Sequence, residues 1–441
     1  IYTVKDTLSL HDALPISMLV LFGSLAVLLI VGAPVALALA GASLLYVLIE
    51  TSLPPVVVLH RMINGVDSFP LLAVPFFILA GNLMNHGGIT DRIFVFAKAL
   101  VGWMRGGLGH VNIGASVLFA GMSGAAVADA GGLGTIEIRA MKEGGYDGDF
   151  AVGVTAASST IGPLIPPSLP LVVYGVVSST SIGQLFAAGL IPGLLMALAL
   201  MVMVAWYAYR RGYGRDAGFS WAVLRRTFVD AFLSLLTPVI IVGGILGGIF
   251  TPTEAAIAAC AYALFLGVVV YGTLTAKRIW EISVETVETT ALVLLIVAAA
   301  SIFSWILTSS RVAEMVAEGI LSRTESTIVV LLLINLVLLI VGFFMEPVAA
   351  ITILTPVLLP VAMSVGVDPV HFGILMTLNL MIGLLTPPVG MVLYVLARVA
   401  SISFERAVTA TLPFLVPLIV VLLIVTYVPA ASMWLPSLIY R

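Results

Sequence analysis

The sequence predicts an all-α, polytopic membrane protein built from two related halves. Hydrophobic residues make up 61% of the 441 residues and charged residues only 9%, whereas a typical soluble protein has about 25% charged residues. Apolar runs of spanning or half-spanning length recur from Met18 to Tyr427. Because a membrane-crossing helix needs roughly 20 apolar residues, the chain has room for on the order of ten crossings plus shorter pieces. The short alternating strands of a membrane barrel are absent from the sequence.

The segment 1–17 does not follow this apolar pattern. It lacks the basic-then-apolar order of a signal peptide, and Met18 then opens a clean membrane run. We therefore predict that residues 1–17 are an extraneous or disordered leader and that Met18 is the native start. A short amphipathic arm that belongs to the protein is the alternative.

Charge and motifs exclude several classes of protein. A basic stripe with interleaved aromatic residues is missing, so we expect no nucleic-acid partner. Cys260 is the one cysteine, so the chain can form neither an internal disulfide nor a thiolate metal cluster. The sequence contains no GxxxxGK[ST] phosphate loop, and its five histidines form no metal-binding motif. We expect neither ATP hydrolysis nor any other enzyme activity.

A basic stretch near the middle of the chain indicates its orientation. Five arginines lie between Arg210 and Arg226, and positively charged loops stay on the cytoplasmic side of a membrane. We predict a cytoplasmic loop over residues 210–228, with a first repeat at 18–209 and a second at 229–441.

Two proline-rich stretches indicate an internal duplication. IGPLIPP begins at Ile161 and IGLLTPP begins at Ile382, which is an offset of 221 in residue number. FAGMSGAAVA around Met122 aligns with GFFMEPVAAI around Met345 at an offset of 223. The sequence does not show the relative orientation of the copies, but matching broken segments in transporters favour inverted repeats.

Proline and glycine predict a broken transmembrane helix in each half, at about 158–170 and 379–391. Each is expected to face a re-entrant helical hairpin, at about 118–140 and 342–362. Broken backbone at membrane depth is tolerated only inside protein or beside a water-filled cavity. Its free carbonyl oxygens suit a hard cation such as Na⁺, and its half-helix N-termini suit a carboxylate. One such segment alone would be a plain proline kink, whereas two in register favour a transport site.

Six motifs in this order and spacing resemble the large membrane (M) subunit of the tripartite ATP-independent periplasmic (TRAP) transporters. They are PLLAVPFFILAGNLM (70–84), GMSGAAVADAGGLG (121–134), IGPLIPPS (161–168), TPTEAA (251–256), DPVHFG (368–373) and TPPVG (386–390). The resemblance covers about residues 18–430. It implies an elevator-type secondary transporter in the bacterial inner membrane, surrounded by lipid. Its substrate would be an organic acid, such as a C4-dicarboxylate or sialic acid, taken from a periplasmic binding protein and coupled to Na⁺. A small four-helix membrane subunit would be a separate chain.

The resemblance also implies binding residues. The first sodium site would use Ser123, Gly162, Ile165 and Pro167, and the second would use Gly383, Thr386 and Val389 with the hairpin near Glu346. The substrate would lie between the hairpin tips, near Ser158, Ser159, Thr355 and Asn379. This chain has Ala125 and Ala126 where similar proteins often carry serine, so a ligand hydroxyl is absent there.

Other polar residues allow more than one interpretation. Asp129 and Glu346 lie in the two matching hairpins, where a carboxylate is either functional or an interfacial residue at a hairpin end. By contrast, Thr251-Pro252-Thr253-Glu254 predicts a helix start, with Thr251 as the N-cap.

Two alternative classes remain open from the residues alone. One is a stand-alone, ion-coupled carboxylate symporter or a sodium/proton antiporter of similar hairpin architecture. The other is an intramembrane serine protease, since Gly121-Met122-Ser123-Gly124 matches GxSG. Such a protease needs a histidine on a neighbouring helix. His110 and His371 both lie at segment ends, and a protease gives no reason for the duplication.

Overall fold

The computed structural model describes residues 5–50, 53–215, 218–322, 324 and 326–440. At residues 5–17, at Glu50, at Ser123 and at four positions of α15 it describes the backbone alone. The predicted all-α class is confirmed: the described residues form helices joined by short loops, with one isolated bridge between Arg105 and Arg215.

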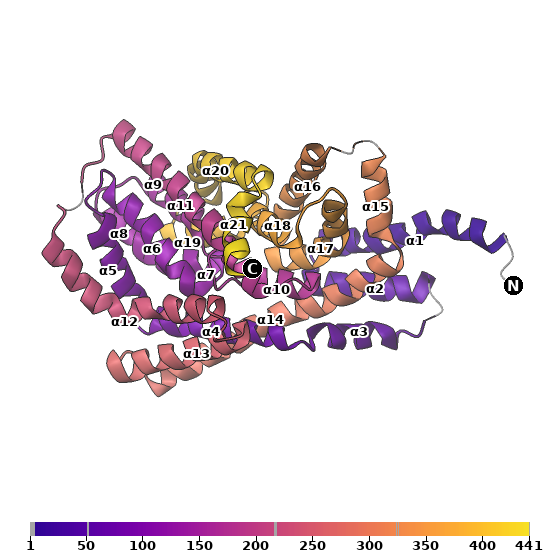
Figure 1. Ribbon diagram of the computed structural model, residues 1–441, viewed down its shortest axis with the longest axis horizontal. Coiled ribbons are helices and arrows are strands. Elements are labelled where there is room, and N and C mark those ends of the chain that lie inside the picture. The colour runs from indigo at the N-terminus through magenta and orange to yellow at the C-terminus, as the bar shows by residue number, and fades with distance from the viewer. Residues whose placement is uncertain (1–4, 51–52, 216–217, 323, 325, 441) are drawn as a thin grey trace.

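The helices fall into two series along the chain (Figure 1). The first series is α1 (Lys5–Ile30), α2 (Val35–Glu50), α3 (Val56–Val66), η1 (Phe69–Leu72), α4 (Ala73–His86), α5 (Ile89–Val101), α6 (Gly107–Ser123), α7 (Ala126–Gly131), α8 (Leu133–Glu143), α9 (Gly148–Ser159), α10 (Leu169–Ser178) and α11 (Ile182–Arg211). The second series is α12 (Trp221–Leu246), α13 (Pro252–Phe265), η2 (Leu266–Val270), α14 (Ala276–Ser309), α15 (Val312–Leu321), α16 (Thr327–Gly342), α17 (Pro347–Ser364), α18 (Pro369–Gly383), α19 (Met391–Ala400), α20 (Phe404–Tyr427) and α21 (Ala430–Ile439).

Among the described residues, seven helices are long and apolar enough to cross a membrane. The sequence had room for about ten crossings, and the difference lies in apolar helices of 10–17 residues such as α16, α18 and α19. These three helices are parts of a hairpin or of a broken helix, and each is shorter than a full membrane crossing. The predicted leader boundary at Met18 falls within the continuous helix α1.

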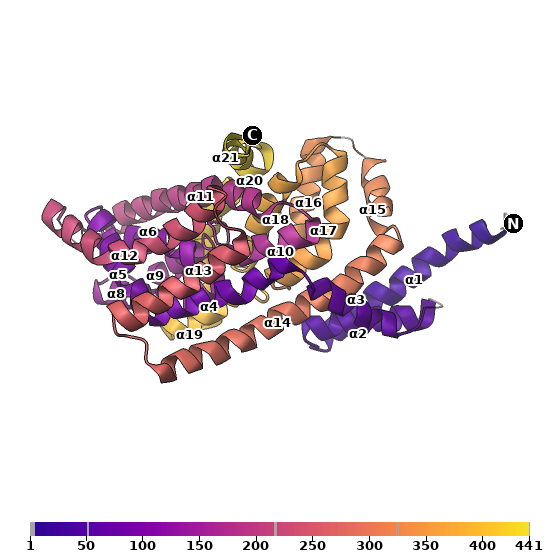
Figure 2. The same ribbon diagram turned by 60° about the horizontal axis from the view of Figure 1, so that its bottom comes forward.

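The long helix α14 connects the two ends of the molecule. It packs against α2 and α3 at one end, and against α4 and α17 along its length. Figure 2 shows α14 running beneath the other helices, with α1, α2 and α3 gathered at its far end. Helices α1–α3 and α14 thus form a layer beside the hairpins and the broken helices.

Two hairpins occur at corresponding places in the chain. We call α6 with α7 and α8 hairpin 1, and α16 with α17 hairpin 2. The returning arm of hairpin 1 covers 126–143 and that of hairpin 2 covers 347–364, so both bounds are related by the offset of 221 found in the motifs. Each hairpin is followed by an interrupted helix, α9–α10 with break 1 (160–168) and α18–α19 with break 2 (384–390).

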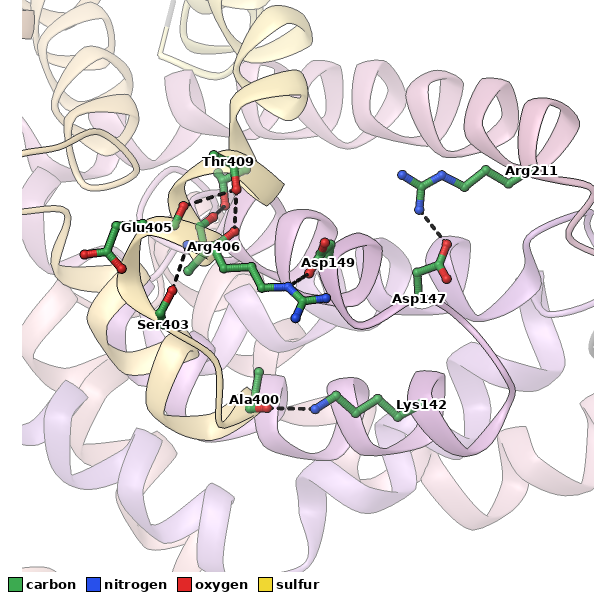
Figure 3. A network of polar contacts seen from close by, with 11 residues as sticks. Lys142, Asp147, Asp149, Arg211, Ala400, Ser403, Glu405, Arg406 and Thr409 are labelled. Carbon is green, nitrogen blue, oxygen red and sulfur yellow. Dashed lines mark hydrogen bonds and ion pairs between the residues drawn. The ribbon is translucent and has the colours of Figure 1, made fainter.

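The two hairpins open toward opposite ends of α20. Near the start of α20, Arg406 Nε lies 2.7 Å from Asp149 Oδ1, beside the base of hairpin 1 (Figure 3). At its other end, the Tyr427 hydroxyl donates to the Ile328 carbonyl at the base of hairpin 2 (3.2 Å). Since α20 has 24 residues, it is about 36 Å long. The bases therefore lie about one membrane thickness apart.

Each broken helix also packs against the hairpin of the other half. Helix α10, which follows break 1, contacts α17 of hairpin 2, and α19, which follows break 2, contacts α7 and α8 of hairpin 1. The Lys142 ammonium donates to the Ala400 carbonyl at the end of α19 (2.8 Å), which fixes α19 beside the end of α8 (Figure 3). The hairpins and broken helices thus form one interlocked unit.

The predicted helix start at Thr251 is confirmed. The Thr251 hydroxyl accepts from the Glu254 backbone N–H (3.3 Å), and the Glu254 carboxylate accepts from the Thr251 N–H (2.8 Å). This reciprocal capping box begins α13 with Pro252 in the first turn. Glu254 therefore has a structural role.

Candidate ion and substrate sites

In the first half, the tip of hairpin 1 touches break 1. Gly124 and Ala125 form this tip, between α6 and α7. The Leu169 backbone N–H, at the end of break 1, donates to the Gly124 carbonyl (3.3 Å). Gly124 has a φ of +60°, and a Cβ there would strike the Pro167 carbonyl oxygen. Only glycine suits both the left-handed backbone and this close approach.

In the second half, the tip of hairpin 2 touches break 2 in the same way. Residues 343–346 form this tip, and the Val389 backbone N–H donates to the Phe343 carbonyl (3.3 Å). A Cβ on Gly383 would lie 2.7 Å from the carbonyl carbon and oxygen of Gly342. The sequences of the two contacts differ, but each consists of one backbone hydrogen bond and one approach that requires glycine.

The breaks carry carbonyl oxygens that are free for other ligands. In break 1, the carbonyl oxygens of Gly162, Ile165 and Pro167 accept no described hydrogen bond. The same holds for Thr386 and Val389 in break 2. Unpaired carbonyls inside a membrane protein are costly unless another group satisfies them. The Pro167 oxygen lies against the tip of hairpin 1, and Val389 is bonded through its N–H to the tip of hairpin 2. A hard cation could satisfy free carbonyls at these two places.

Two predicted sodium ligands, Thr386 and Ser123, would use side-chain oxygens, and the structure describes the side chain of Thr386 alone. The Thr386 hydroxyl donates to the Gly383 carbonyl (2.8 Å), so two predicted ligands of the second site are in contact. The Ser123 backbone ends α6 next to Gly124, but the Ser123 side chain lies outside the described part of the chain. The set of predicted sodium ligands remains a prediction.

The four predicted substrate ligands are all buried and bonded to protein groups. The hydroxyls of Ser158 and Ser159 donate to Asn112 Oδ1 (2.6 Å) and to the Ala156 carbonyl (2.8 Å). The Thr355 hydroxyl lies 3.5 Å from the Met376 sulfur. Asn379 Nδ2 donates to Asn335 Oδ1 (2.8 Å), while Asn379 Oδ1 has no described partner. A substrate would reach most of these groups only after an internal bond breaks, and their role in binding it remains a prediction.

Two asparagines that sequence reasoning missed tie each hairpin to its broken helix. Asn112 on α6 donates to Thr155 (2.7 Å) and accepts from Ser158, both on α9. Asn335 on α16 accepts from Asn379 on α18. The offset in residue number is 223 from Asn112 to Asn335 and 221 from Ser158 to Asn379, as in the motifs. A search of the apolar helices for polar residues at these offsets would have found this signal.

The two hairpin carboxylates have different surroundings. Glu346 is the N-cap of α17, and its carboxylate accepts from the Ala349 backbone N–H (3.1 Å). Asp129 on α7 is 2% exposed, and neither of its oxygens has a hydrogen-bond partner among the described residues. Glu346 thus stabilises a helix start, while Asp129 has no such explanation.

A polar cavity of about 500 Å³ separates hairpin 1 from α4, α5 and α14. Its polar lining comes from Asn82, Asn85, His86, Thr90, Asp91 and Glu285, and its apolar lining includes Val127 and Val395. None of the predicted substrate ligands is among these described lining residues. The cavity lies between the interlocked unit and the helices beside it.

The geometry disfavours the serine-protease alternative. His110 and Ser123 belong to the same helix, α6, and their positions along it are about 20 Å apart. His371 is 2% exposed, and its Nδ1 lies 2.6 Å from the Ser432 hydroxyl. Both histidines are buried in the first turns of helices, and His110 cannot take a proton from Ser123.

Membrane-spanning helices, paired hairpins and two broken helices define an integral membrane transport protein. Comparison with known proteins agrees. Residues 22–431 match the family described as "Tripartite ATP-independent periplasmic transporter, DctM component". The chain is 53% identical over 411 residues to the sialic acid TRAP transporter large permease protein SiaM of Vibrio cholerae, covering 93% of this chain and 96% of that protein.

Two further matches are more distant. The C4-dicarboxylate TRAP transporter large permease protein DctM of Vibrio cholerae is 38% identical over 433 residues, covering 93% of this chain and 96% of that protein. The crystal structure of the Alcanivorax borkumensis YdaH transporter has a TM-score of 0.56 and 16% identity, over 86% of this chain and 89% of that chain. This last likeness concerns the fold alone.

The chain therefore belongs to the DctM family, the large permease components of TRAP transporters. It is a multi-pass protein of the inner membrane and a transport protein rather than an enzyme.

Proposed function

We propose that this permease imports an organic acid, with sialic acid as the first candidate, and that the import is driven by sodium. The identity to a permease named for sialic acid, 53%, exceeds the identity to one named for C4-dicarboxylates, 38%.

The observation that carries the proposal is the repeated contact between hairpin tip and helix break. Gly124 accepts from Leu169, and Phe343 accepts from Val389. Each contact lies beside free carbonyl oxygens, and oxygen is the ligand that hard cations prefer. Sodium in these places would satisfy the free carbonyls and bind each tip to its break. The positive ends of α10 and α19 would then favour a carboxylate nearby.

The arrangement of the helices supports inverted repeats and an elevator-type movement. The bases of the two hairpins lie at opposite ends of α20, and α10 and α19 pack against each other's hairpins. A unit interlocked in this way would move as one body beside α14 and α1–α3. Binding of sodium would stabilise the body in the state that holds the substrate.

Partners follow from the same family relationship. We propose that a periplasmic binding protein delivers the acid and that a small four-helix membrane subunit accompanies this chain. Lipid and this subunit would cover apolar side chains that are exposed here on α1–α3, such as Leu19, Leu48, Val56 and Leu59.

The test is uptake into proteoliposomes that contain this chain with its small subunit, with binding protein outside. Labelled sialic acid and a labelled C4-dicarboxylate are compared under an inward sodium gradient. We expect sialic acid to enter only when all three proteins and sodium are present. Uptake by this chain alone would favour the stand-alone symporter instead.

The orientation is tested separately by cysteine labelling. Gly218 lies in the basic loop with no heavy atom within 4 Å of its Cβ position, so Gly218→Cys fits without strain. With Cys260 replaced by alanine, this cysteine should react with a membrane-impermeant reagent only from the cytoplasmic side. Ser364→Cys, at the base of hairpin 2, is the matched control and should react from the opposite side.

A further inference from the structure

Hairpin 1 buries two carboxyl groups that have no counterpart in hairpin 2. Asp129 on α7 is 2% exposed and Glu137 on α8 is 1% exposed. The corresponding positions of the second half, at the offset of 221, hold Ala350 and Leu358. The contact between tip and break therefore does not require acidic groups, and those of hairpin 1 need a separate explanation.

The two groups lack the partners that buried carboxylates normally have. Among the described residues, both oxygens of Asp129 and Oε1 of Glu137 are buried with no hydrogen-bond partner, and no lysine or arginine pairs with either group. On α8, one turn before Glu137, the Cβ position of Gly134 lies 3.6 Å from the Asp129 backbone oxygen, so α7 and α8 pack closely here. Ser116 on α6 lies beside the Asp129 carboxyl group. Two uncompensated charges in such a place are strongly unfavourable. The negative charge of the pair therefore has to be neutralised, either by protonation or by a bound metal cation.

The pair lies within a polar seam between hairpin 1 and α9. On α8, Gly134, Glu137 and Met141 follow the three- and four-residue spacing of one helix face. A Cβ on Gly134 would lie 2.9 Å from the Thr155 methyl, and Asn112 Nδ2 lies 3.9 Å from the Met141 sulfur. Glu137 therefore faces the same seam as the Asn112–Thr155–Ser158 network.

Few other charged side chains of the described residues lie near this seam. The helices that pack against α7 and α8 are α6, α9 and α19. The other titratable groups on these helices and on α8 itself are His110, Arg139, Lys142, Glu143, Asp149, Arg398 and the exposed Tyr394. Arg139, Lys142, Glu143 and Arg398 are at least partly exposed, Asp149 pairs with Arg406, and buried His110 lies on α6 about 9 Å along the axis from Ser116. The described neighbours thus leave the pair without a compensating cation.

A proton fits this place better than a metal ion. Sodium needs several oxygen ligands arranged around it at once. A proton needs one acceptor oxygen and can be shared by two carboxyl groups.

We propose that Asp129 and Glu137 form a proton-carrying pair in hairpin 1, a second ion-coupling element that deepens the proposed sodium-driven import and rests on it. The proton passes from water to a carboxylate oxygen and returns to water, and no other bond changes. Its route is short, because Val127, Ala128 and Gly131 on the opposite side of α7 line the polar cavity of about 500 Å³. Movement of this six-residue helix away from its neighbours would let that water reach Asp129.

The first experiment needs no substrate, so it separates this proposal from the proposed function. The purified chain is titrated with pH while the carbonyl stretch of protonated carboxyl groups is followed by difference infrared spectroscopy. We expect a band of a buried carboxylic acid that Asp129→Asn and Glu137→Gln each remove or shift, and that Glu143→Gln on the exposed side of α8 leaves unchanged. A band that is absent from the wild type, or indifferent to both substitutions, overturns the proposal.

The second experiment measures the proton in transport. Uptake of sialic acid by the assembled transporter is compared with and without an inward pH gradient at saturating sodium. The wild type should be stimulated, and Asp129→Asn and Glu137→Gln should lose the stimulation while the sodium concentration for half-maximal uptake stays the same. Unchanged stimulation in both variants contradicts the proposal. A several-fold rise in that sodium concentration also contradicts it, because the pair would then hold sodium. Thermal unfolding of the purified variants distinguishes a loss of coupling from a loss of fold, and Glu137→Asp should restore the stimulation in part.

Discussion

Break 1 and break 2 make the same contact with a hairpin tip but lie in different surroundings. Every residue from 161 to 168 is buried, and Gly189 of α11 approaches the Leu164 carbonyl so closely that a Cβ there would clash with it. In break 2, Pro387 and Pro388 are exposed and Val389 is 36% exposed. Helix α11 thus covers break 1, while one side of break 2 remains open.

If both breaks bind sodium as proposed, this difference predicts different roles for the two sites. An ion at break 1 would exchange only when the surrounding helices separate, whereas an ion at break 2 could exchange with water directly. We therefore expect the second site to set the apparent sodium affinity and the first to hold the interlocked unit together. Each prediction below perturbs one side of this comparison.

The largest effect is expected where a side chain would force a tip away from its break. In Gly383→Ala the new Cβ would lie 2.7 Å from the Gly342 carbonyl group, and overpacking of this kind costs about 1–3 kcal/mol. Since the tip must move, uptake should fall to near background while the protein still inserts. Gly114→Ala, whose Cβ would meet only the Val101 side chain at 3.4 Å, is the matched control and should transport normally. Equal uptake by both variants would show that the tip contact is dispensable.

Thr386→Ala should weaken the second sodium site. It removes the hydroxyl that lies 2.8 Å from the Gly383 carbonyl and leaves the backbone break in place. Loss of a ligand worth about 1–2 kcal/mol raises the sodium concentration for half-maximal uptake about tenfold. Thr386→Ser retains the oxygen and should behave like the wild type. The check is uptake against sodium at fixed pH, and an unshifted curve would remove Thr386 from the site.

The asparagine bonds should affect stability more than sodium affinity. Ser158→Ala leaves Asn112 Oδ1 without its 2.6 Å donor, and Asn379→Ala removes both bonds to Asn335. A buried group left unpaired costs about 1–3 kcal/mol, so both variants should unfold at lower temperature, Asn379→Ala more so. A large rise in KM for the acid with unchanged thermal stability would instead assign these residues to substrate binding.

The smallest effect is expected at the ion pair of Arg406 and Asp149. Its side chains are 60% and 42% exposed, and exposed pairs contribute at most about 1 kcal/mol. Arg406→Ala should lower thermal stability only slightly and leave the sodium dependence of uptake unchanged. A strong uptake defect in this variant would mean that the base of hairpin 1 is itself a moving contact.

The sequence predicted the elements that strong local chemistry determines. Paired prolines locate both breaks, because proline removes a donor and clashes with the preceding turn, and the capping box at Thr251 fixes the start of α13. Hairpin ends were harder to predict. The expected ranges, 118–140 and 342–362, begin close to the tips, whereas hairpin 1 extends over 107–143 and hairpin 2 over 327–364. The tip of hairpin 1, Gly124-Ala125, lies in a run of small apolar residues and produces no change in hydropathy that would reveal it. The tip of hairpin 2 is marked by a single polar residue, Glu346.

Contacts between segments that are far apart in the chain could not be predicted from the sequence. Ser158 and Asn379 look like free polar groups in apolar helices, and only the packing of α6 on α9 and of α16 on α18 shows their partners. Break 1 is buried because α11 covers it, and nothing in the sequence of α11 shows which segment that helix packs against. By contrast, the residues of those polar contacts are related by the same offsets of 221 and 223 as the motifs. Comparing the two halves position by position would therefore have pointed to these residues.

The most direct test of the central claim is uptake by the assembled transporter as a function of external sodium at fixed pH. Two tip–break sites predict a sigmoidal dependence, with a Hill coefficient above one, and a curve that Thr386→Ala shifts to higher sodium. A pH gradient should add to this uptake without replacing sodium. Uptake that is indifferent to sodium and follows the proton gradient alone would contradict the account.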